Sequence, residues 1–165
     1  GFPIAAIAGP NHIMESIEYG KVLHYGSHNA PRLGLFATKT MLEEMSRGNY
    51  AGYKKISEIG DQMTKRLNQA AADTGQNMRV QNIGSMFHQV FTDLHEITNY
   101  REFCQTVDLA KYTEFSLKMR DQGIFFSGKK ILHNLSYTEH TQADIDASIE
   151  AAGNALEQMS NKARV

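Results

Sequence analysis

The spacing of apolar and polar residues changes along the chain, and it starts with extended segments. Residues 1–9 are a run of small and branched apolar residues between two glycines, typical of a strand buried on both faces. Residues 11–17 predict a short helix with Asn11 as its cap, and residues 21–25 a second short extended run. A polar loop, Gly26-Ser27-His28-Asn29, follows.

Helical spacing then takes over. Apolar residues lie on one helical face from Leu33 onward, until Arg47-Gly48-Asn49 interrupts the pattern. A longer apolar stripe runs from Ile56 to Ala70, and Gly75 fits the C-terminal cap of that helix. Two separate helices are therefore expected on either side of the interruption.

Two more helices have recognisable first turns. Asp108 can cap a helix that ends at Gly123. Thr141 and Asp144 have the spacing of a capping box, and apolar residues follow at helical intervals. This final helix is the clearest prediction in the chain.

Segments rich in β-forming residues separate these helices. Val80–Thr92 predicts a strand in which Gly84 marks a bulge or a tight approach. Ile124–Phe126 and Ile131–Ser136 predict two more strands, joined by Ser127-Gly128-Lys129-Lys130.

The order of these elements predicts the fold class. Residues 49–165 read as helix, strand, helix, strand, strand, helix, which indicates a small α+β domain with helices over a mostly antiparallel sheet. Residues 1–48 resemble the end of a larger α/β domain. We therefore expect the boundary between two domains near residue 48.

Composition narrows the functional classes. The 165 residues carry a formal net charge of −1, which argues against a nucleic-acid or anionic-membrane partner. A single cysteine, Cys104, excludes an internal disulfide and favours a reducing compartment such as the cytoplasm. Residues 2–8 are too short to span a bilayer and lack the basic start of a signal peptide.

Side chains with obvious chemistry give weak signals. The histidines have no metal-binding spacing, so no metal site is predicted. Cys104 is expected to be an inert small hydrophobe, and Lys129-Lys130 a solvated turn. The seven histidines are His12, His24, His28, His88, His95, His133 and His140.

The loop at residues 26–29 is the most informative polar cluster. Its backbone N–H groups and the Ser27 hydroxyl precede a helix and can hold an anion. Ser27 or Asn29 can equally serve only as the cap of that helix. The residues alone leave both interpretations open.

Several segments together resemble a known family, the class-III aminotransferases that depend on pyridoxal 5′-phosphate, and most of all the glutamate-1-semialdehyde aminomutases. The resemblance covers nearly the whole chain, and it is to the C-terminal portion of these enzymes. The segments that carry it are Gly1–Gly9 with Ile13-Met14, Gly26–Ala30 with Leu33, Gly84–Phe87 with Phe91-Thr92-Asp93, and His140-Thr141 with Asp144-Ile145-Asp146.

This resemblance implies a site and partners. The reactive lysine would lie a few residues before Gly1, so no catalytic residue is assigned within the chain. The backbone N–H of Gly26, with the hydroxyl and N–H of Ser27, would bind the cofactor phosphate of the other subunit in a homodimer. Residues 49–165 would be the C-terminal small domain of a fold-type-I enzyme. Its substrate would be a small amino acid or amino-aldehyde.

The chain departs from the family pattern at three places. Ser27 replaces the usual threonine but keeps the hydroxyl, and Pro31-Arg32 stand where Asn-Pro is common. Ser127–Lys130 replaces a longer acidic loop. No arginine that binds a substrate carboxylate is matched, which favours aminomutase-like enzymes over ordinary transaminases.

Three functional hypotheses follow. The first is a C-terminal segment of an aminotransferase or aminomutase that is inactive alone and binds the cofactor weakly or not at all. The second is a non-catalytic dimerisation or interaction domain derived from that family, because the helix face of Leu33, Phe36 and Met41 needs cover. An unrelated α+β domain that binds phosphate is the third.

Overall fold

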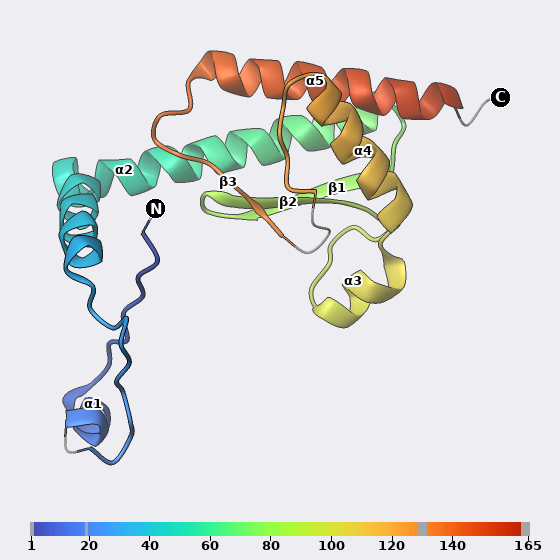
Figure 1. Ribbon diagram of the computed structural model, residues 1–165. Coiled ribbons are helices and arrows are strands. Elements are labelled where there is room, and N and C mark those ends of the chain that lie inside the picture. Colours follow the sequence, from blue (N-terminus) through green and yellow to red (C-terminus); the bar gives the residue numbers. More distant parts are fainter. Residues whose placement is uncertain (1, 19, 129–131, 163–165) are drawn as a thin grey trace. The chain divides into compact units, whose positions relative to one another are not determined.

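Eight elements form the fold of the computed structural model, which describes residues 2–18, 20–128 and 132–162 (Figure 1). Two compact units divide the chain, Gly1–Gly52 and Tyr53–Val165. The predicted domain boundary near residue 48 lies close to this division, and the domain assignment itself stays a prediction. The elements are α1 (Asn11–Glu18), α2 (Arg32–Asp73), β1 (Met78–Ile83), β2 (Met86–Phe91), α3 (Tyr100–Thr106), α4 (Leu109–Asp121), β3 (Asn134–Leu135) and α5 (Gln142–Lys162).

The first unit contains helices but none of the extended pairing that the sequence predicted. The helix at α1 is confirmed, although its first hydrogen bonds go to the carbonyl of Pro10, so Asn11 is the first helical residue and not the cap. The strand predicted at residues 2–8 is wrong, because this segment has no regular structure and is mostly exposed. Residues 21–25 form no strand either. A strand needs a hydrogen-bonded neighbour, and no described residue of this unit supplies one.

A sharp break interrupts α2 where the sequence predicted it. Arg47 leaves the helical region with ψ 150°, and the next three residues adopt the left-handed conformation, with φ 57° at Gly48, 56° at Asn49 and 65° at Tyr50. Glycine and asparagine tolerate this conformation, whereas a tyrosine there costs about 1–2 kcal/mol. The predicted interruption is therefore confirmed.

Gly75 ends α2 as predicted. Its φ is 68°, its N–H donates to the carbonyl of Ala72, and the N–H of Gln76 donates to the carbonyl of Ala71. These two bonds define the Schellman motif, in which the left-handed residue is usually glycine.

Replacing Gly75 by alanine tests this cap. A Cβ at this position meets no atom within 4 Å, so the cost of Gly75→Ala comes from backbone conformation alone. We expect the free energy of unfolding to fall by about 1–2 kcal/mol, measured by urea denaturation. Gly75→Asn should lose clearly less, because asparagine tolerates this conformation. Equal stability of Gly75→Ala and the parent chain would contradict the assignment.

The second unit contains a three-stranded antiparallel sheet, in the order β1-β2-β3. β1 and β2 pair over their whole length, from Met78 opposite Phe91 to Ile83 opposite Met86. β3 adds two residues, Asn134 and Leu135, to the other side of β2. The α+β class and the mostly antiparallel sheet predicted from the sequence are confirmed.

Three strand predictions need correction. Val80–Thr92 is a hairpin and not one strand, because Gly84 and Ser85 form a two-residue turn with φ 56° at Gly84. Ile124–Phe126 joins no sheet, and of the described residues 132–136 only Asn134–Leu135 is paired as a strand. Ile131 and Lys129-Lys130 lie outside the described residues.

The hairpin turn packs directly on the backbone of α2. A Cβ built on Gly60 would lie 2.1 Å from the carbonyl oxygen of Gly84 and 3.3 Å from the Cα of Ser85. Only glycine at position 60 permits this approach. The tight approach that the sequence indicated at Gly84 is thus confirmed, and its partner is a glycine on another element.

The core of the second unit lies between the sheet and α2, α4 and α5. α2 and α5 run in the same direction, side by side in Figure 1, and Arg66 of α2 pairs with Asp146 of α5. The caps predicted for α4 and α5 are confirmed: Asp108 accepts from the N–H groups of Ala110 and Lys111 at 2.9 Å. Fully buried members of the core include Leu67, Met78, Phe91, Tyr112, Phe115, Met119 and Leu156.

An asparagine from α2 covers part of the free edge of β1. The Asn68 Nδ2 donates to the carbonyl of Val80, and the Val80 N–H donates to the Asn68 Oδ1, both at 2.9 Å. A single side chain therefore satisfies the two backbone groups that Val80 would otherwise offer to another strand.

Among the described residues, none of the helices has the length and apolar character that a membrane span requires.

Candidate functional site

The predicted phosphate loop is an exposed turn in the first unit. The N–H of Asn29 donates to the carbonyl of Gly26 at 3.0 Å and closes the turn, with Ser27 and His28 at its corner. The side chain of Asn29 folds back over Gly26, because a Cβ there would lie 3.3 Å from the Asn29 Oδ1. A side chain at position 26 would therefore crowd the amide of Asn29, and glycine avoids this contact.

The capping interpretation of this loop is not borne out. The first hydrogen bond of α2 goes from the N–H of Leu35 to the carbonyl of Pro31, so Pro31 precedes the first helical residue. Among the described residues, neither Ser27 nor Asn29 donates or accepts a side-chain hydrogen bond at the start of the helix. Pro31 therefore lies at the N-cap, one residue before the N1 position at which proline is most common.

The donors of this turn fit a phosphate group. Within the described residues no hydrogen bond uses the backbone N–H of Gly26, the N–H of Ser27 or the Ser27 hydroxyl. Backbone N–H groups and a hydroxyl are the types of donor that bind phosphate oxygens. No described residue of this chain is assigned a contact with the ring of such a cofactor.

A cavity of about 500 Å³ in the second unit is a second candidate site. Its residues come from α2, β2, β3, the start of α5 and the segments on both sides of residues 129–131. This cavity was not predicted, because its walls come from segments far apart in the chain. Its lining includes Ile59, Met63, Phe87, Phe126, Ser127, His133, Asn134, Tyr137, His140, Asp144, Ile145, Ala147 and Ser148.

A chain of hydrogen bonds between partly buried polar groups holds one wall of the cavity. The Asn134 Nδ2 donates to the Gln89 Oε1, and the Asn134 Oδ1 accepts from the N–H of Ser127, both at 2.8 Å. The carbonyl of Ser127 accepts from the hydroxyl of Tyr112 at 2.6 Å. The segment before residue 128, which forms no strand, is thus attached to the sheet through a side chain.

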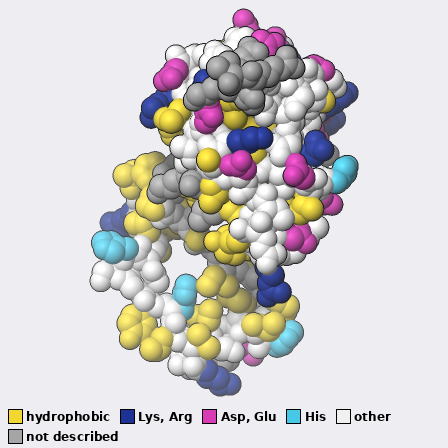
Figure 2. Space-filling model, turned by 90° about the vertical axis from the view of Figure 1, so that its right-hand side faces the viewer, with side chains coloured by type: hydrophobic (Ala, Val, Ile, Leu, Met, Phe, Trp, Pro, Cys, Tyr) yellow, Lys and Arg dark blue, Asp and Glu magenta, His cyan; other side chains and the backbone are white. Residues whose placement is uncertain are grey.

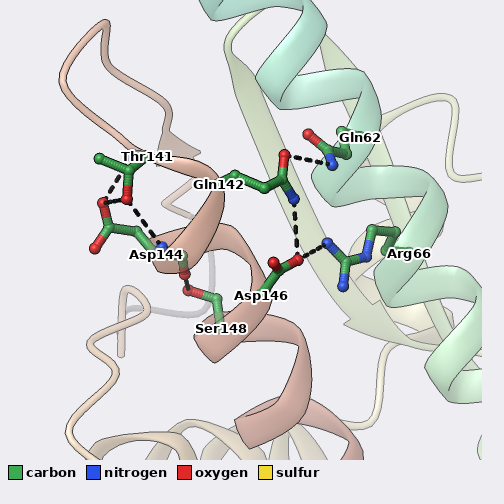
Figure 3. Close-up of polar contacts among 7 residues, drawn as sticks. All are labelled: Gln62, Arg66, Thr141, Gln142, Asp144, Asp146 and Ser148. Atoms are coloured by element: carbon green, nitrogen blue, oxygen red, sulfur yellow. Dashed lines mark hydrogen bonds and ion pairs between the residues drawn. The ribbon is translucent and has the colours of Figure 1, made fainter.

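Figure 3 shows the polar contacts at the start of α5, beside the cavity. The N–H and the hydroxyl of Thr141 both donate to the Asp144 Oδ2, at 2.8 and 2.7 Å, which confirms the predicted capping box. These hydrogen bonds lower the pKa of the Asp144 carboxyl, with a smaller contribution from His140. The side chain therefore stays ionised at neutral pH.

The other residues with obvious chemistry are not brought together. Cys104 is exposed on α3, a helix that the sequence did not clearly predict and that Asn99 caps. In the described part of the chain, no three histidine, cysteine, aspartate or glutamate side chains are placed so that they could hold a metal ion.

The helix face that the sequence marked as needing cover is exposed. Leu33 is 69% exposed, Phe36 71% and Met41 60%. Figure 2 shows many hydrophobic side chains, in yellow, lying openly on the face that it draws. An apolar helix face of this kind typically contacts another polypeptide.

Sequence comparison finds relatives that are glutamate-1-semialdehyde 2,1-aminomutases. The chain is 28% identical to glutamate-1-semialdehyde 2,1-aminomutase from Akkermansia muciniphila over 160 residues, which is 96% of this chain and 37% of that protein. It is 30% identical to the enzyme of the same name from Nitratidesulfovibrio vulgaris over 154 residues, 92% of this chain and 35% of the relative. The chain therefore spans about a third of the length of these curated relatives. No family model matches it.

Structure comparison finds transaminases. A β-phenylalanine aminotransferase from Variovorax paradoxus matches 93% of this chain with a TM-score of 0.78 and 21% identity, over 35% of its own length. An omega-transaminase from Sphaerobacter thermophilus matches 93% of the chain with a TM-score of 0.74 and 18% identity, over 34% of its length. The chain thus has the fold of part of a transaminase, and the resemblance to aminomutases that its motifs indicated is confirmed.

Proposed function

We propose that this chain forms part of a pyridoxal-phosphate-dependent aminotransferase or aminomutase that acts on a small amino acid or amino-aldehyde. The observation that carries the proposal is the agreement of two comparisons. Relatives named as glutamate-1-semialdehyde aminomutases match 96% of the sequence, and transaminases match its fold with a TM-score of up to 0.78. In such enzymes the cofactor supplies the electron sink, and the protein supplies binding and orientation.

Within this function, the turn at Gly26 and Ser27 is proposed to bind the cofactor phosphate. The two N–H groups and the Ser27 hydroxyl are the donors. Hydrogen bonds to a charged group contribute about 1.5–3 kcal/mol each, whereas association costs about 4–15 kcal/mol. Three such bonds barely offset that cost, so the 165-residue chain by itself should bind the cofactor only at millimolar concentration.

Amide NMR titrations of the full chain test this role. Pyridoxal 5′-phosphate and inorganic phosphate should both shift the amide signals of Gly26 and Ser27, whereas pyridoxal, which lacks the phosphate, should not. Ser27→Ala should weaken the response by about tenfold, because one hydrogen bond to a charged group is lost. Ser46→Ala is the matched control, since its exposed hydroxyl bonds only the carbonyl of Glu43 in its own helix.

Two results would count against the proposal. Equal amide shifts with pyridoxal and with pyridoxal 5′-phosphate would show that the turn does not recognise the phosphate group. A tight, saturable change in visible absorbance when the cofactor meets the chain alone would show that a reactive lysine lies within these 165 residues, contrary to the assignment.

The exposed face of Leu33, Phe36 and Met41 favours a second candidate, a dimerisation or interaction domain. This face is also where a homodimer of the enzyme would find apolar cover, so self-association fits both functions. Sedimentation of the parent chain and of Phe36→Glu tests whether this helix face mediates self-association. A dimer that Phe36→Glu dissociates, in a chain whose Gly26 and Ser27 amides ignore phosphate, would favour the second candidate.

A further inference from the structure

The cavity beside the start of α5 has an apolar floor in an otherwise polar neighbourhood. Ile59 and Met63 of α2, Phe87 of β2, Phe126 and Ile145 all line it and are all buried. At about 500 Å³ its volume lies in the range of small-molecule sites. The apolar floor can accept the body of an aromatic or branched ligand without uncovering any polar group.

The Asp144 carboxylate at this cavity is held in place by hydrogen bonds to one of its two oxygens. Both hydrogen bonds from Thr141 go to the Asp144 Oδ2. Among the described residues no hydrogen bond reaches the Asp144 Oδ1, and Figure 3 draws none there. The capping box therefore fixes the side chain, which is exposed, and leaves its second oxygen open to solvent and to a ligand.

The other polar groups at the cavity set the sign of the charge that it prefers. The N–H of Tyr137 donates to the His140 Nδ1 at 3.1 Å, so the lone pair of that nitrogen is already used and a neutral His140 carries its proton on Nε2. Asp144 is the only carboxylate among the lining residues, and no lysine or arginine lines the described part of the cavity. Within the described lining, and with its two histidines neutral, the one charged side chain is a carboxylate, which favours a cation over an anion.

We propose that this cavity binds a small organic amine, with its aromatic or branched apolar body on the floor and its ammonium group on the Asp144 Oδ1. An ammonium there makes a charge-assisted hydrogen bond. A ligand with a carboxylate in the same place would face Asp144 without a compensating cation. This inference rests on the second unit alone and does not depend on the proposed cofactor turn.

Three ligands with one body and different charges test the proposal on the full chain. Tryptamine carries an ammonium, tryptophol a neutral hydroxyl and indole-3-acetate a carboxylate. At about pH 8, where imidazole side chains are largely neutral, tryptamine should bind about two- to fivefold more tightly than tryptophol, the effect of one exposed ion pair. Indole-3-acetate should bind more weakly than either. Amide NMR shifts of the lining residues report the binding.

Two variants test the apolar cavity and the charge of Asp144 separately. Ala147→Phe places a ring in the cavity from an exposed helix position and should abolish binding of all three ligands. Ala143→Phe is its control, because Ala143 is exposed on the same helix and does not line the cavity. Asp144→Asn keeps an oxygen for the Thr141 donors and removes the charge, so it should erase the preference for tryptamine while tryptophol still binds.

The possible outcomes divide clearly. Cavity-localised binding in the order amine, alcohol, acid, blocked by Ala147→Phe and levelled by Asp144→Asn, supports the site. Equal binding of the three ligands, shifts that persist in Ala147→Phe, or no binding at millimolar concentration overturns it. Circular dichroism spectra of each variant identify any that fails to fold, and Ala147→Phe and Asp144→Asn give independent tests.

Discussion

Gly60→Ala is expected to destabilise the second unit by about 3 kcal/mol, a large effect for one added methyl group. The added Cβ would lie 2.1 Å from the carbonyl oxygen of Gly84, and the obstructing atom belongs to the backbone. No side-chain rotation can relieve the overlap, so the hairpin must move away from α2. The melting temperature should fall by about 10 °C or more.

The control for this prediction is another helical glycine. Gly153 lies on α5, its φ is not in the left-handed region, and a Cβ there meets no atom within 4 Å. Gly153→Ala should therefore raise the free energy of unfolding by about 0.5–1 kcal/mol, because alanine is the better helix former. Opposite signs for the two substitutions in thermal and urea unfolding support the packing of the hairpin on α2. A loss below 1 kcal/mol in Gly60→Ala would contradict it.

The second large effect is expected from Asn134→Leu. This substitution leaves the Gln89 Oε1 and the N–H of Ser127 without their partner, and Gln89 is 0% exposed. Each buried polar group left unpaired costs about 1–3 kcal/mol, so a total loss of about 2–4 kcal/mol is expected. Urea denaturation measures this loss, and NMR signals of the segment before residue 128 should change with it.

A double-mutant cycle identifies the cause. Replacing Gln89 as well, in Gln89→Leu with Asn134→Leu, removes both amides and should recover part of the loss. Asn154→Leu is the surface control. Its amide donates to exposed Gln122, the residue after α4, and its loss should change stability by less than about 0.5 kcal/mol. Strict additivity of the Gln89 and Asn134 substitutions would show that the two amides do not act together.

Features with a local cause were predictable from the sequence. Gly75 ends α2 because a left-handed residue is needed there, and Thr141 with Asp144 starts α5 because three residues separate the two halves of a capping box. The break at Gly48 has the same local origin. The order of helices and strands predicted the α+β class, and the quoted motifs predicted the likeness to aminomutases that the sequence comparison supports.

Features that depend on distant partners were not predictable. The apolar run at residues 2–8 reads as a strand, but pairing and not composition makes a strand. Val80–Thr92 looks continuous because the turn at Gly84 and Ser85 contains only two residues. The amide of Asn134 carries no sign of its contact with Gln89, 45 residues earlier in the chain. The cavity beside α5 was missed for the same reason.

The asparagine on the edge of β1 has a consequence for the behaviour of the protein at high concentration. An exposed edge strand recruits strands from other molecules through its free backbone groups and so nucleates aggregation. Asn68 occupies the N–H and the carbonyl of Val80, at the middle of that edge. A second molecule could extend the sheet only by displacing it. This one side chain therefore helps to keep the sheet from polymerising and contributes to solubility without adding a charge.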